Sequence, residues 1–552
     1  MDEYELNKLL TKINELETEL KTAKKYGLVW DRETTEEIIA KECSTKIPVL
    51  TNIKDNNIEN GEINNILIEG DNLHSLITLQ SVFENRVDFI YIDPPYNTGH
   101  EDFAYNDKFV NEDDGYKHSK WLSFMSKRLK LAKNLLSDDG VMFISIDDNE
   151  QANLRLLCNS IFGENCVEQY IWCLQDKTEG SFVKTAGLTV RKEHEYIIAC
   201  FKNSGKRFKR YKGEREFSDG SFSNPDNDPR GPWFSGNISR NGIKSTTGSK
   251  YYSITNPAGE VFTRNWTLSK EEYETALAEG RIYFSKGGAG VPRLKIYANQ
   301  DTFLIQSSLF NDVHTSITGK NELKNIFGGE SPFNFPKPPS LIKRLLEIAS
   351  NENSIILDFF AGSGTTGQAV LELNKEDFGK RQFILCTNNE NEICTKITYP
   401  RIKTVITGKR VDGSPYGDNM KTNLYYYKTS FVNDLKNTDQ AKYNLAEKLD
   451  ELLCILEDIY KPVSKNSYSS HYSNLDNSKH LFIYNDFYNK NNFEEFVNLI
   501  NSTQGEKTVY IYGNNDDCLY ESYEINNAII KAIPAKIYET YKEIVAFLKR
   551  GE

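Results

Sequence analysis

A short apolar run that ends in two prolines is the feature that most constrains this chain. Phe89 to Ile92 are all apolar, and either aromatic or β-branched, which predicts a buried strand. Asp93-Pro94-Pro95-Tyr96 follows directly, and because proline lacks a backbone N–H the strand must stop there. One carboxylate, one carbonyl and one aromatic ring are thereby expected in a small rigid space at the carboxyl end of a buried strand.

These groups suit a planar ring that carries an exocyclic amine. Asp93 and the carbonyl of Pro94 can accept the two amine hydrogens while Tyr96 stacks on the ring. The alternative is a strand that ends in a proline turn with an Asp that caps the next helix. The complete Asp-Pro-Pro-Tyr sequence after an apolar strand favours the amine site.

A second strand is predicted at 354–360, and it runs into the glycine-rich segment Ala361 to Gly367 and an apolar helix. Glycines at a helix N-terminus let a ligand approach the backbone. A nucleotide phosphate loop would need a Lys that is absent. Gly362, Gly364 and Gly367 satisfy the dinucleotide pattern, with Glu390 further on for ribose hydroxyls, so a dinucleotide stays an alternative. We favour S-adenosylmethionine, because it gives the amine site at Asp93 a methyl donor.

The order of these motifs, with Asp93 to Tyr96 before a basic insertion and Phe360 to Gly364 after it, resembles the circularly permuted beta class of amino-group DNA methyltransferases. The chain looks most like the modification (Mod) subunit of type III restriction-modification systems. The segments that carry this likeness are Tyr26 to Trp30, Gly70 to Leu73, Tyr91 to Gly99, Trp121 to Met125, Gly288 to Lys295 and Phe335 to Pro338.

The resemblance implies a role for each motif residue. The catalytic residues would be Asp93, Pro94, Pro95 and Tyr96, which hold and stack a flipped adenine. Asp71 would meet the cofactor's adenine, Glu390 its ribose and Lys337 its carboxylate. The full set of cofactor-binding residues would be Asp71, Lys337, Asp358, Phe360, Ala361, Gly362, Gly364, Thr365 and Glu390. No metal is required.

Basic and aromatic side chains alternate where the composition changes, after residue 202. A charge run is usually a solvated face, but next to a base-sized site it favours DNA binding through phosphates and base edges. The candidates for DNA contact are Lys206, Arg207, Lys209, Arg210, Lys212 and Arg293.

The predicted fold is α/β, a Rossmann-like adenosylmethionine-dependent methyltransferase fold of the permuted class. We expect five parts: an N-terminal helix and arm (1–45), the catalytic half of the core (46–202), a target recognition domain (203–330), the cofactor half (331–415) and a C-terminal α+β assembly domain (416–552). Heptad spacing of Leu6, Ile13 and Leu20 predicts a helix that packs on its own protein or on a second copy.

Composition narrows the class of protein further. No apolar run in the 552 residues approaches the roughly 20 needed to cross a bilayer, and the N-terminus is acidic, so we expect a cytoplasmic protein without a membrane partner. The nine cysteines show no zinc spacing. The net charge of −12 argues weakly against nucleic acid, although the basic residues cluster.

The expected activity is methylation of adenine N6 in double-stranded DNA. The resemblance adds a second copy of the chain and an ATP-dependent restriction (Res) subunit as partners. Two alternatives remain open: methylation of cytosine N4, for which the same pocket would serve, and a DNA-reading specificity subunit without catalysis.

Overall fold

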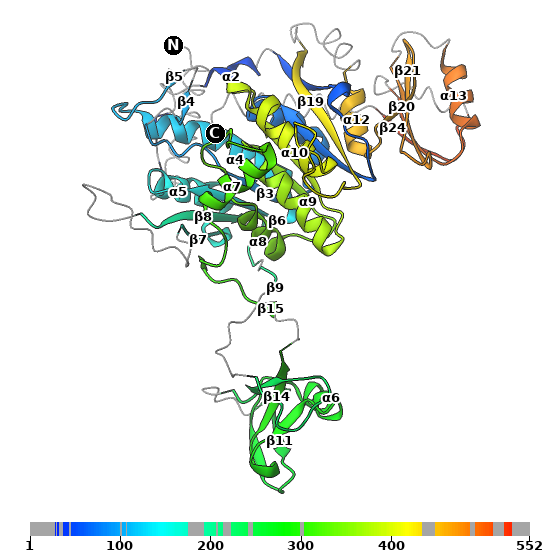
Figure 1. The fold of residues 1–552 in the computed structure, drawn as a ribbon. Coiled ribbons are helices and arrows are strands. Elements are labelled where there is room, and N and C mark those ends of the chain that lie inside the picture. The colour runs from blue at the N-terminus through cyan, green and yellow to red at the C-terminus, as the bar shows by residue number, and fades with distance from the viewer. Residues whose placement is uncertain are drawn as a thin grey trace, which may run out of the picture. The chain divides into compact units, whose positions relative to one another are not determined.

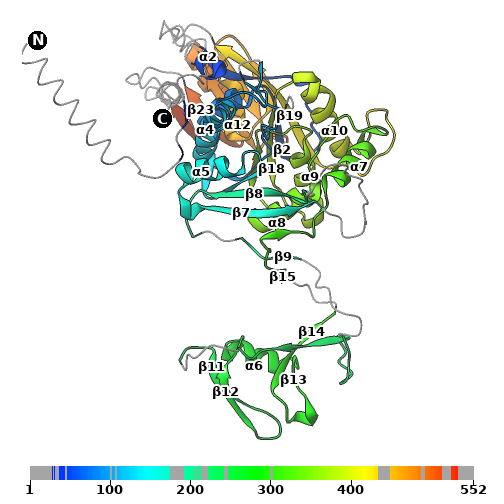
Figure 2. The same ribbon diagram turned by 90° about the vertical axis from the view of Figure 1, so that its left-hand side faces the viewer.

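The computed structural model describes residues 28, 30–31, 37–43, 46–99, 102–105, 108–174, 192–205, 208–212, 222–240, 247–298, 303–432, 448–485, 492–511 and 524–532. They belong to two compact units, one formed by 1–209 with 307–552 and the other by 210–306 (Figures 1 and 2). The helix predicted from the heptad spacing lies outside the described residues.

A ten-stranded mixed sheet is the centre of the larger unit, in the order β1-β19-β2-β18-β17-β3-β6-β8-β7-β16. The strands from β19 to β6 are parallel to one another, whereas β1 and β8 run against their neighbours. The strands are β1 Ile47–Asn52, β2 Ile63–Glu69, β3 Val87–Ile92, β6 Leu136–Ile146, β7 Val167–Cys173, β8 His194–Phe201, β16 Leu309–Phe310, β17 Ile355–Asp358, β18 Gln382–Thr387 and β19 Thr422–Val432. The predicted α/β class is confirmed by this arrangement.

Two groups of helices pack on the sheet, and Figure 2 shows the sheet between them. The first group is α3 Asn72–Phe83, α4 Lys117–Leu135 and α5 Gln151–Phe162; the second is α7 Ser316–Phe327, α8 Pro339–Ala349, α9 Thr365–Asp377 and α10 Tyr399–Thr407. The short helix α2 Ile38–Glu42 and the β4–β5 hairpin (Ala104–Tyr105, Lys108–Phe109) complete this part. No helix among the described residues combines the length and the apolar character needed to span a bilayer.

Strands β3 and β17 are neighbours in the middle of the sheet, although they are far apart in the chain. Ile356 lies opposite Phe89 in a parallel register. A carboxylate oxygen of Asp88 also accepts a hydrogen bond of 3.0 Å from the backbone N–H of Ile355. Because carboxyl ends of parallel strands meet at one edge, the segments that follow β3 and β17 come together there.

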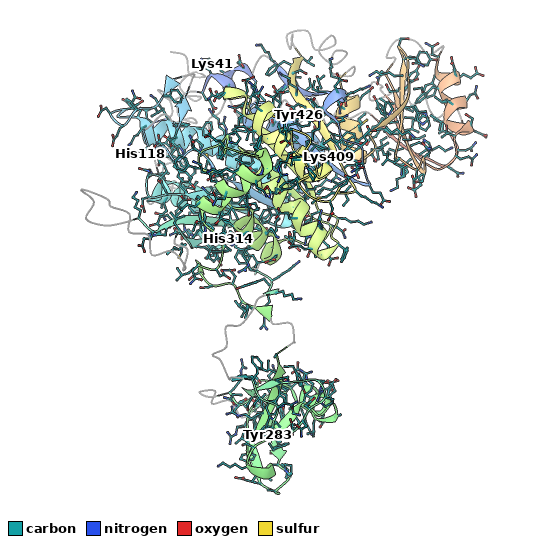
Figure 3. All side chains as sticks on the ribbon, in the orientation of Figure 1. Lys41, His118, Tyr283, His314, Lys409 and Tyr426 are labelled. Atoms are coloured by element: carbon teal, nitrogen blue, oxygen red, sulfur yellow. The ribbon has the colours of Figure 1, made fainter. Side chains whose placement is uncertain are left out.

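The structure corrects the predicted start of the C-terminal domain. Residues 422–432, predicted to belong to it, form β19, which pairs with β1 and β2 inside the main sheet. The hydroxyl of Tyr426, labelled in Figure 3, donates to Glu69 at the end of β2 at 2.8 Å. The tyrosine-rich sequence of β19 contains no motif, so only its strand pairing shows that it belongs to the ten-stranded sheet.

The C-terminal region contains a five-stranded sheet of its own, β20-β21-β22-β23-β24. Its elements are α12 Asp450–Glu457, β20 Lys461–Lys465, β21 Ser469–Ser473, β22 Lys479–Tyr484, α13 Phe493–Ser502, β23 Glu506–Ile511 and β24 Ala528–Ala532. Apolar runs at 481–484 and 509–512 predict two strands, which are confirmed as β22 and β23. The Ser- and Asn-rich residues 464–478 predict a linker, which is wrong, because β21 and the end of β20 occupy them.

The second unit, residues 210–306, has its own small core around Ile238, Ile254 and Trp266. Its elements are β9 Tyr211–Lys212, β10 Trp233–Asn237, β11 Tyr251–Thr255, β12 Val261–Asn265, α6 Lys270–Ala278, β13 Ile282–Phe284, β14 Pro292–Tyr297 and β15 Phe303–Leu304. Tyr283 of β13 marks this unit in Figure 3. Its two ends pair with each other through β9 and β15. It lies within the range predicted as a recognition domain, a role that stays a prediction.

Candidate active site

A cavity of about 520 Å³ lies at the carboxyl ends of β3, β17 and β18. Asp93, Pro94 and Pro95 of the first motif and Phe360 and Gly362 of the second line it together. The remaining lining residues are Glu37, Ile38, Ile39, Glu42, Asp71, Asn72, Asp102, Phe103, Phe124, Phe359, Cys386, Thr387, Asn388, Glu390 and Ile393. The two motifs therefore contribute to a single site.

A cluster of four polar side chains adjoins this cavity. The ammonium of Lys337 lies 3.0 Å from Oδ1 of Asp93 and 3.3 Å from Oε2 of Glu195, and it donates to the hydroxyl of Tyr96 at 2.8 Å. The Tyr96 hydroxyl is also within 2.9 Å of Asp93 Oδ1 and 3.0 Å of Glu195 Oε2. Lys337 has only 8% of its side chain exposed.

Electrostatics keep Lys337 charged and Tyr96 neutral near neutral pH. Burial alone would lower the pKa of Lys337, but Asp93 and Glu195 outweigh it and raise that pKa above its ordinary value. Burial, with Asp93 and Glu195 nearby, raises the pKa of the Tyr96 hydroxyl. The cluster therefore holds an ammonium, a neutral phenol and two carboxyl groups.

The turn after β3 is held from behind by buried groups. The carbonyl of Pro95 accepts from the indole N–H of Trp121 at 2.8 Å. Asn97 has a φ of 58° and donates to the buried carboxylate of Glu150 at 2.6 Å. The spacing of Asp147 and Glu150 predicts a capping box for α5, but α5 has no side-chain cap, and Glu150 bonds Asn97 instead.

The glycine-rich segment forms the turn between β17 and α9. Gly362 and Gly364 have φ of 49° and 82°, the left-handed region that favours glycine. Asp358 does not line the cavity; its carboxylate accepts from the backbone N–H of Phe360 at 3.0 Å and from the hydroxyl of Thr366 at 2.5 Å. Burial raises the pKa of Asp358 to about 7.

Arg401 of α10 contacts the same turn, and the sequence did not predict this contact. Its guanidinium donates to the hydroxyls of Ser363 and Thr365, both at 2.8 Å. Arg401 is fully buried, and burial lowers its pKa to about 10. Thr365 and Ala361 were predicted to bind the cofactor; neither lines the cavity, and the Thr365 hydroxyl is bonded to Arg401.

The predicted cofactor contacts at Asp71 and Glu390 both lie on the cavity. Asp71 also caps α3, accepting from the backbone N–H of Leu73 at 2.7 Å. Its position therefore fits a helix cap as well as a cofactor contact. Glu390 follows β18 in a short turn, next to Asn388 on the cavity wall. Lys337 has partners other than a cofactor carboxylate, since Asp93, Glu195 and Tyr96 surround its ammonium.

A buried ion pair that the sequence did not reveal borders the cavity. Arg128 of α4 makes a two-pronged contact with Glu37, at 2.8 and 3.1 Å, and its guanidinium stacks 3.6 Å from the ring of Phe124. Glu195 was missed as well. It lies near the start of β8, which runs antiparallel to β6, so the amino end of β8 lies at the same sheet edge as Asp93. The apolar run at 195–201 predicts a strand but does not reveal its direction, so the sequence contains no signal for this residue.

The predicted DNA-contact residues fall into three groups. Lys206 and Arg207 lie outside the described residues. Lys209 belongs to the larger unit, and its ammonium donates to the carbonyl of Ser350 of the same unit at 2.9 Å. Arg210 and Lys212 are exposed at the start of the second unit, and Arg293 lies half-buried on β14. Their contact with DNA stays a prediction.

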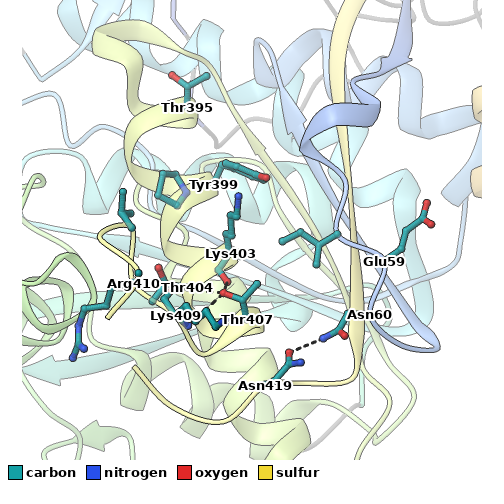
Figure 4. Close-up of a pocket in the computed structure, with 14 residues that line it drawn as sticks. Glu59, Asn60, Thr395, Tyr399, Lys403, Thr404, Thr407, Lys409, Arg410 and Asn419 are labelled. Carbon is teal, nitrogen blue, oxygen red and sulfur yellow. Dashed lines mark hydrogen bonds between the residues drawn. The ribbon is translucent and has the colours of Figure 1, made fainter. Parts of the chain in front are cut away.

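A second cavity, of about 690 Å³, lies beside α10 (Figure 4). Tyr399, Lys403 and Thr407 of that helix line one side, and Asn60, which bonds Asn419 at 2.6 Å, lies on the other. It is larger than the first cavity, yet no predicted catalytic or cofactor residue lines it. The smaller cavity is therefore the candidate active site.

Comparison with known proteins agrees with this geometry. A family model described as DNA methylase (N6_N4_Mtase) matches residues 87–398, a range that includes both motifs. The chain belongs to this DNA methylase family.

Within the family, the chain belongs with the modification subunits of type III restriction-modification enzymes. The EcoPI Mod subunit of Escherichia phage P1 is 31% identical over 467 residues, which cover 73% of this chain and 70% of that protein. The StyLTI Mod subunit of Salmonella typhimurium LT2 is 36% identical over 375 residues, 63% of this chain and 56% of that protein. The chain thus matches little more than half the length of the StyLTI subunit.

Among solved structures, the PvuII DNA methyltransferase (cytosine-N4-specific) overlaps with a TM-score of 0.33 at 13% identity, over 63% of this chain and 92% of that one. The fold of this chain is defined by its own sheet topology.

Proposed function

We propose that this protein is a DNA methyltransferase that transfers a methyl group from S-adenosylmethionine to N6 of adenine in double-stranded DNA. The observation that carries the proposal is that Asp93, from the amine-binding motif, and Gly362, from the glycine turn, line the same cavity. A methyl donor and a ring amine bound to these two segments would meet at one place.

The cavity fits adenosylmethionine better than a dinucleotide. Its described lining includes the acidic residues Glu37, Glu42, Asp71, Asp93, Asp102 and Glu390 and no Lys or Arg. A pyrophosphate would be repelled there, whereas a ligand with a sulfonium and an ammonium would be attracted. Asp71, Phe360, Gly362 and Glu390 are the residues that would hold the cofactor. The volume of about 520 Å³ is in the usual range for a ligand of this size.

The mechanism follows from the chemistry of the amine. The lone pair of an arylamine is delocalised into its ring, so the nitrogen is a poor nucleophile. Hydrogen bonds from the amine to Asp93 and to the Pro94 carbonyl favour a tetrahedral nitrogen whose lone pair points outward. The bound cofactor supplies a methyl group on a positively charged sulfur. The base must first leave the duplex stack, at a cost of a few kcal/mol, and Tyr96 offers it a ring to stack on.

The reaction, the base and the cofactor can be tested in one experiment. Purified protein is incubated with mixed-sequence duplex DNA and methyl-labelled adenosylmethionine, and the DNA is digested to nucleosides. Label on N6-methyladenine is the expected result. Label on cytosine N4 would keep the mechanism and change the base. Absence of label, with cofactor bound in a separate titration, would favour the non-catalytic specificity subunit.

The family membership supports a place in a type III restriction-modification system. We propose that a Res subunit and a second copy of the chain are its partners, that residues 203–330 read the DNA, and that the C-terminal sheet serves assembly in the cytoplasm. The relatives named above are Mod subunits of such enzymes, which supports the partner subunit. Light scattering of the purified chain tests the dimer, because a monomer mass would contradict it.

A further inference from the structure

Lys337 has no N–H left for a cofactor. A lysine ammonium has three N–H donors. Three acceptors surround this one: Asp93 Oδ1 at 3.0 Å, Glu195 Oε2 at 3.3 Å and the Tyr96 hydroxyl at 2.8 Å. The side chain is nearly inaccessible and does not line the cavity in which the cofactor is placed.

Two aromatic rings fix the position of this ammonium further. Its nitrogen lies 5.0 Å from the centre of the Tyr96 ring and 5.7 Å from that of Trp172. Trp172 is fully buried, so its ring limits the movement of the ammonium toward it. The desolvation cost of a buried ammonium is offset only where the ammonium is paired, and here both carboxylates pair with it.

The geometry at Asp93 shows what this arrangement does. Lys337 and Tyr96 both bond the same carboxylate oxygen, Oδ1. Among the described residues these contacts all end on Oδ1 and none on Oδ2, and Asp93 lines the cavity. Fixing one oxygen of a carboxylate fixes the plane of the group, so the second oxygen is held in one direction.

We infer that Lys337 and Glu195 are positioning residues that orient Asp93 toward the amine of the target base. Lys337 holds Oδ1 of Asp93, Glu195 in turn holds Lys337, and Oδ2 is left to accept the amine hydrogen. This inference rests on the proposed function. It replaces the cofactor carboxylate, implied by the resemblance, as the partner of Lys337.

The two roles of Lys337 predict different kinetics. A residue that orients Asp93 affects the chemical step and leaves cofactor affinity unchanged, whereas a cofactor ligand affects affinity. The variants are Lys337→Met, which keeps the length without the charge, Lys337→Arg and Glu195→Gln. Lys375→Met is the matched control, because Lys375 lies on α9 with an exposed side chain that pairs with Asp418.

For each full-length variant, calorimetry gives the dissociation constant of S-adenosylhomocysteine. A second assay gives the single-turnover rate of methyl transfer to mixed-sequence DNA at saturating adenosylmethionine. For Lys337→Met we expect the rate to fall about 100-fold or more, with the dissociation constant within about twofold of the unsubstituted protein. Glu195→Gln should lose about tenfold in rate, Lys337→Arg should recover part of the loss, and Lys375→Met should change neither quantity.

A rate within about twofold of the unsubstituted protein in Lys337→Met would overturn the inference alone. A dissociation constant raised about tenfold, with the rate at saturation restored, would overturn it in favour of a cofactor contact. Calorimetric binding shows that a variant is folded, and Glu195→Gln, which keeps the shape of the side chain, tests the same arrangement if Lys337→Met does not fold. No methylation by the unsubstituted protein would overturn the proposed function and this inference with it.

Discussion

Arg401 and Ser363 are joined by two hydrogen bonds: the guanidinium donates to the hydroxyl of Ser363 at 2.8 Å and to its carbonyl at 3.3 Å. This contact ties α10 to the glycine turn on which the cofactor is expected to rest. The turn has a backbone hydrogen bond of its own, from the N–H of Gly364 to the carbonyl of Ala361 at 2.7 Å. Arg401 adds a buried side-chain contact from a helix that is distant in the chain.

Substituting Arg401 by Met should therefore damage both stability and cofactor binding. Ser363 and Thr365 would lose their buried donor, and we expect unfolding to become easier by roughly 2–4 kcal/mol. The affinity for S-adenosylhomocysteine should fall at least about tenfold. Thermal unfolding and calorimetry measure the two effects. Lys403→Met, on the exposed face of the same helix, serves as the control and should change neither.

The substitution Asp93→Ala should abolish methylation and leave cofactor and DNA binding largely intact. The amine would lose its carboxylate acceptor, which corresponds to a loss of about 100-fold or more in rate. The measurement is label transfer to DNA, with calorimetric titration of S-adenosylhomocysteine in parallel. Loss of folding instead of loss of rate would contradict the assignment of Asp93 to the chemistry.

Gly364 should not tolerate a side chain. Its φ is 82°, and a Cβ added there would lie 3.1 Å from Cγ2 of Thr398. We expect Gly364→Ala to destabilise the turn by about 1–2 kcal/mol and to weaken cofactor binding. Gly329→Ala is the matched control, because an added Cβ there meets nothing within 4 Å. Equal effects of the two substitutions would exclude backbone strain as the cause.

Asp358 should give the protein a characteristic dependence of stability on pH. Burial raises the pKa of its carboxyl group from 3.8 to about 7, so between these values the folded state keeps a proton that the unfolded state releases. The free energy of unfolding should therefore fall as pH rises through this window, by roughly 4 kcal/mol at most from this group, and level off above it. Asp358→Asn should lack this part of the decline in urea unfolding measured at several pH values. Parallel profiles for the two proteins would contradict the assignment.

The sequence allowed the middle of the sheet and the two motifs to be predicted, because buried parallel strands are short apolar runs whose ends carry the chemistry. Phe89 to Ile92 and Ile355 to Leu357 show this directly, and both lie in the strands expected. Glu195, Glu37 and Arg401 could not be assigned in the same way. Each acts on a residue far away in the chain, and pairing across such separations depends on strand order and helix packing.

Local patterns were also ambiguous where two partners compete for one side chain. Glu150 fits a capping box by spacing, yet Asn97 and His118 both bond its carboxylate at 2.6 Å. Lys337 stands in a motif that the resemblance connects with the cofactor, yet two carboxylates lie closer. In both cases a partner from a distant part of the chain decided the outcome, and spacing along the chain contains no information about it.

The pairing of β9 with β15 has a consequence for how such a chain can change over generations. Tyr211 lies opposite Leu304, so the two ends of the intervening segment leave side by side. Because no described strand between these two positions belongs to the ten-stranded sheet, replacing the segment by another would leave the strand order of that sheet unchanged. The active-site residues and the inserted segment can thereby change independently of each other.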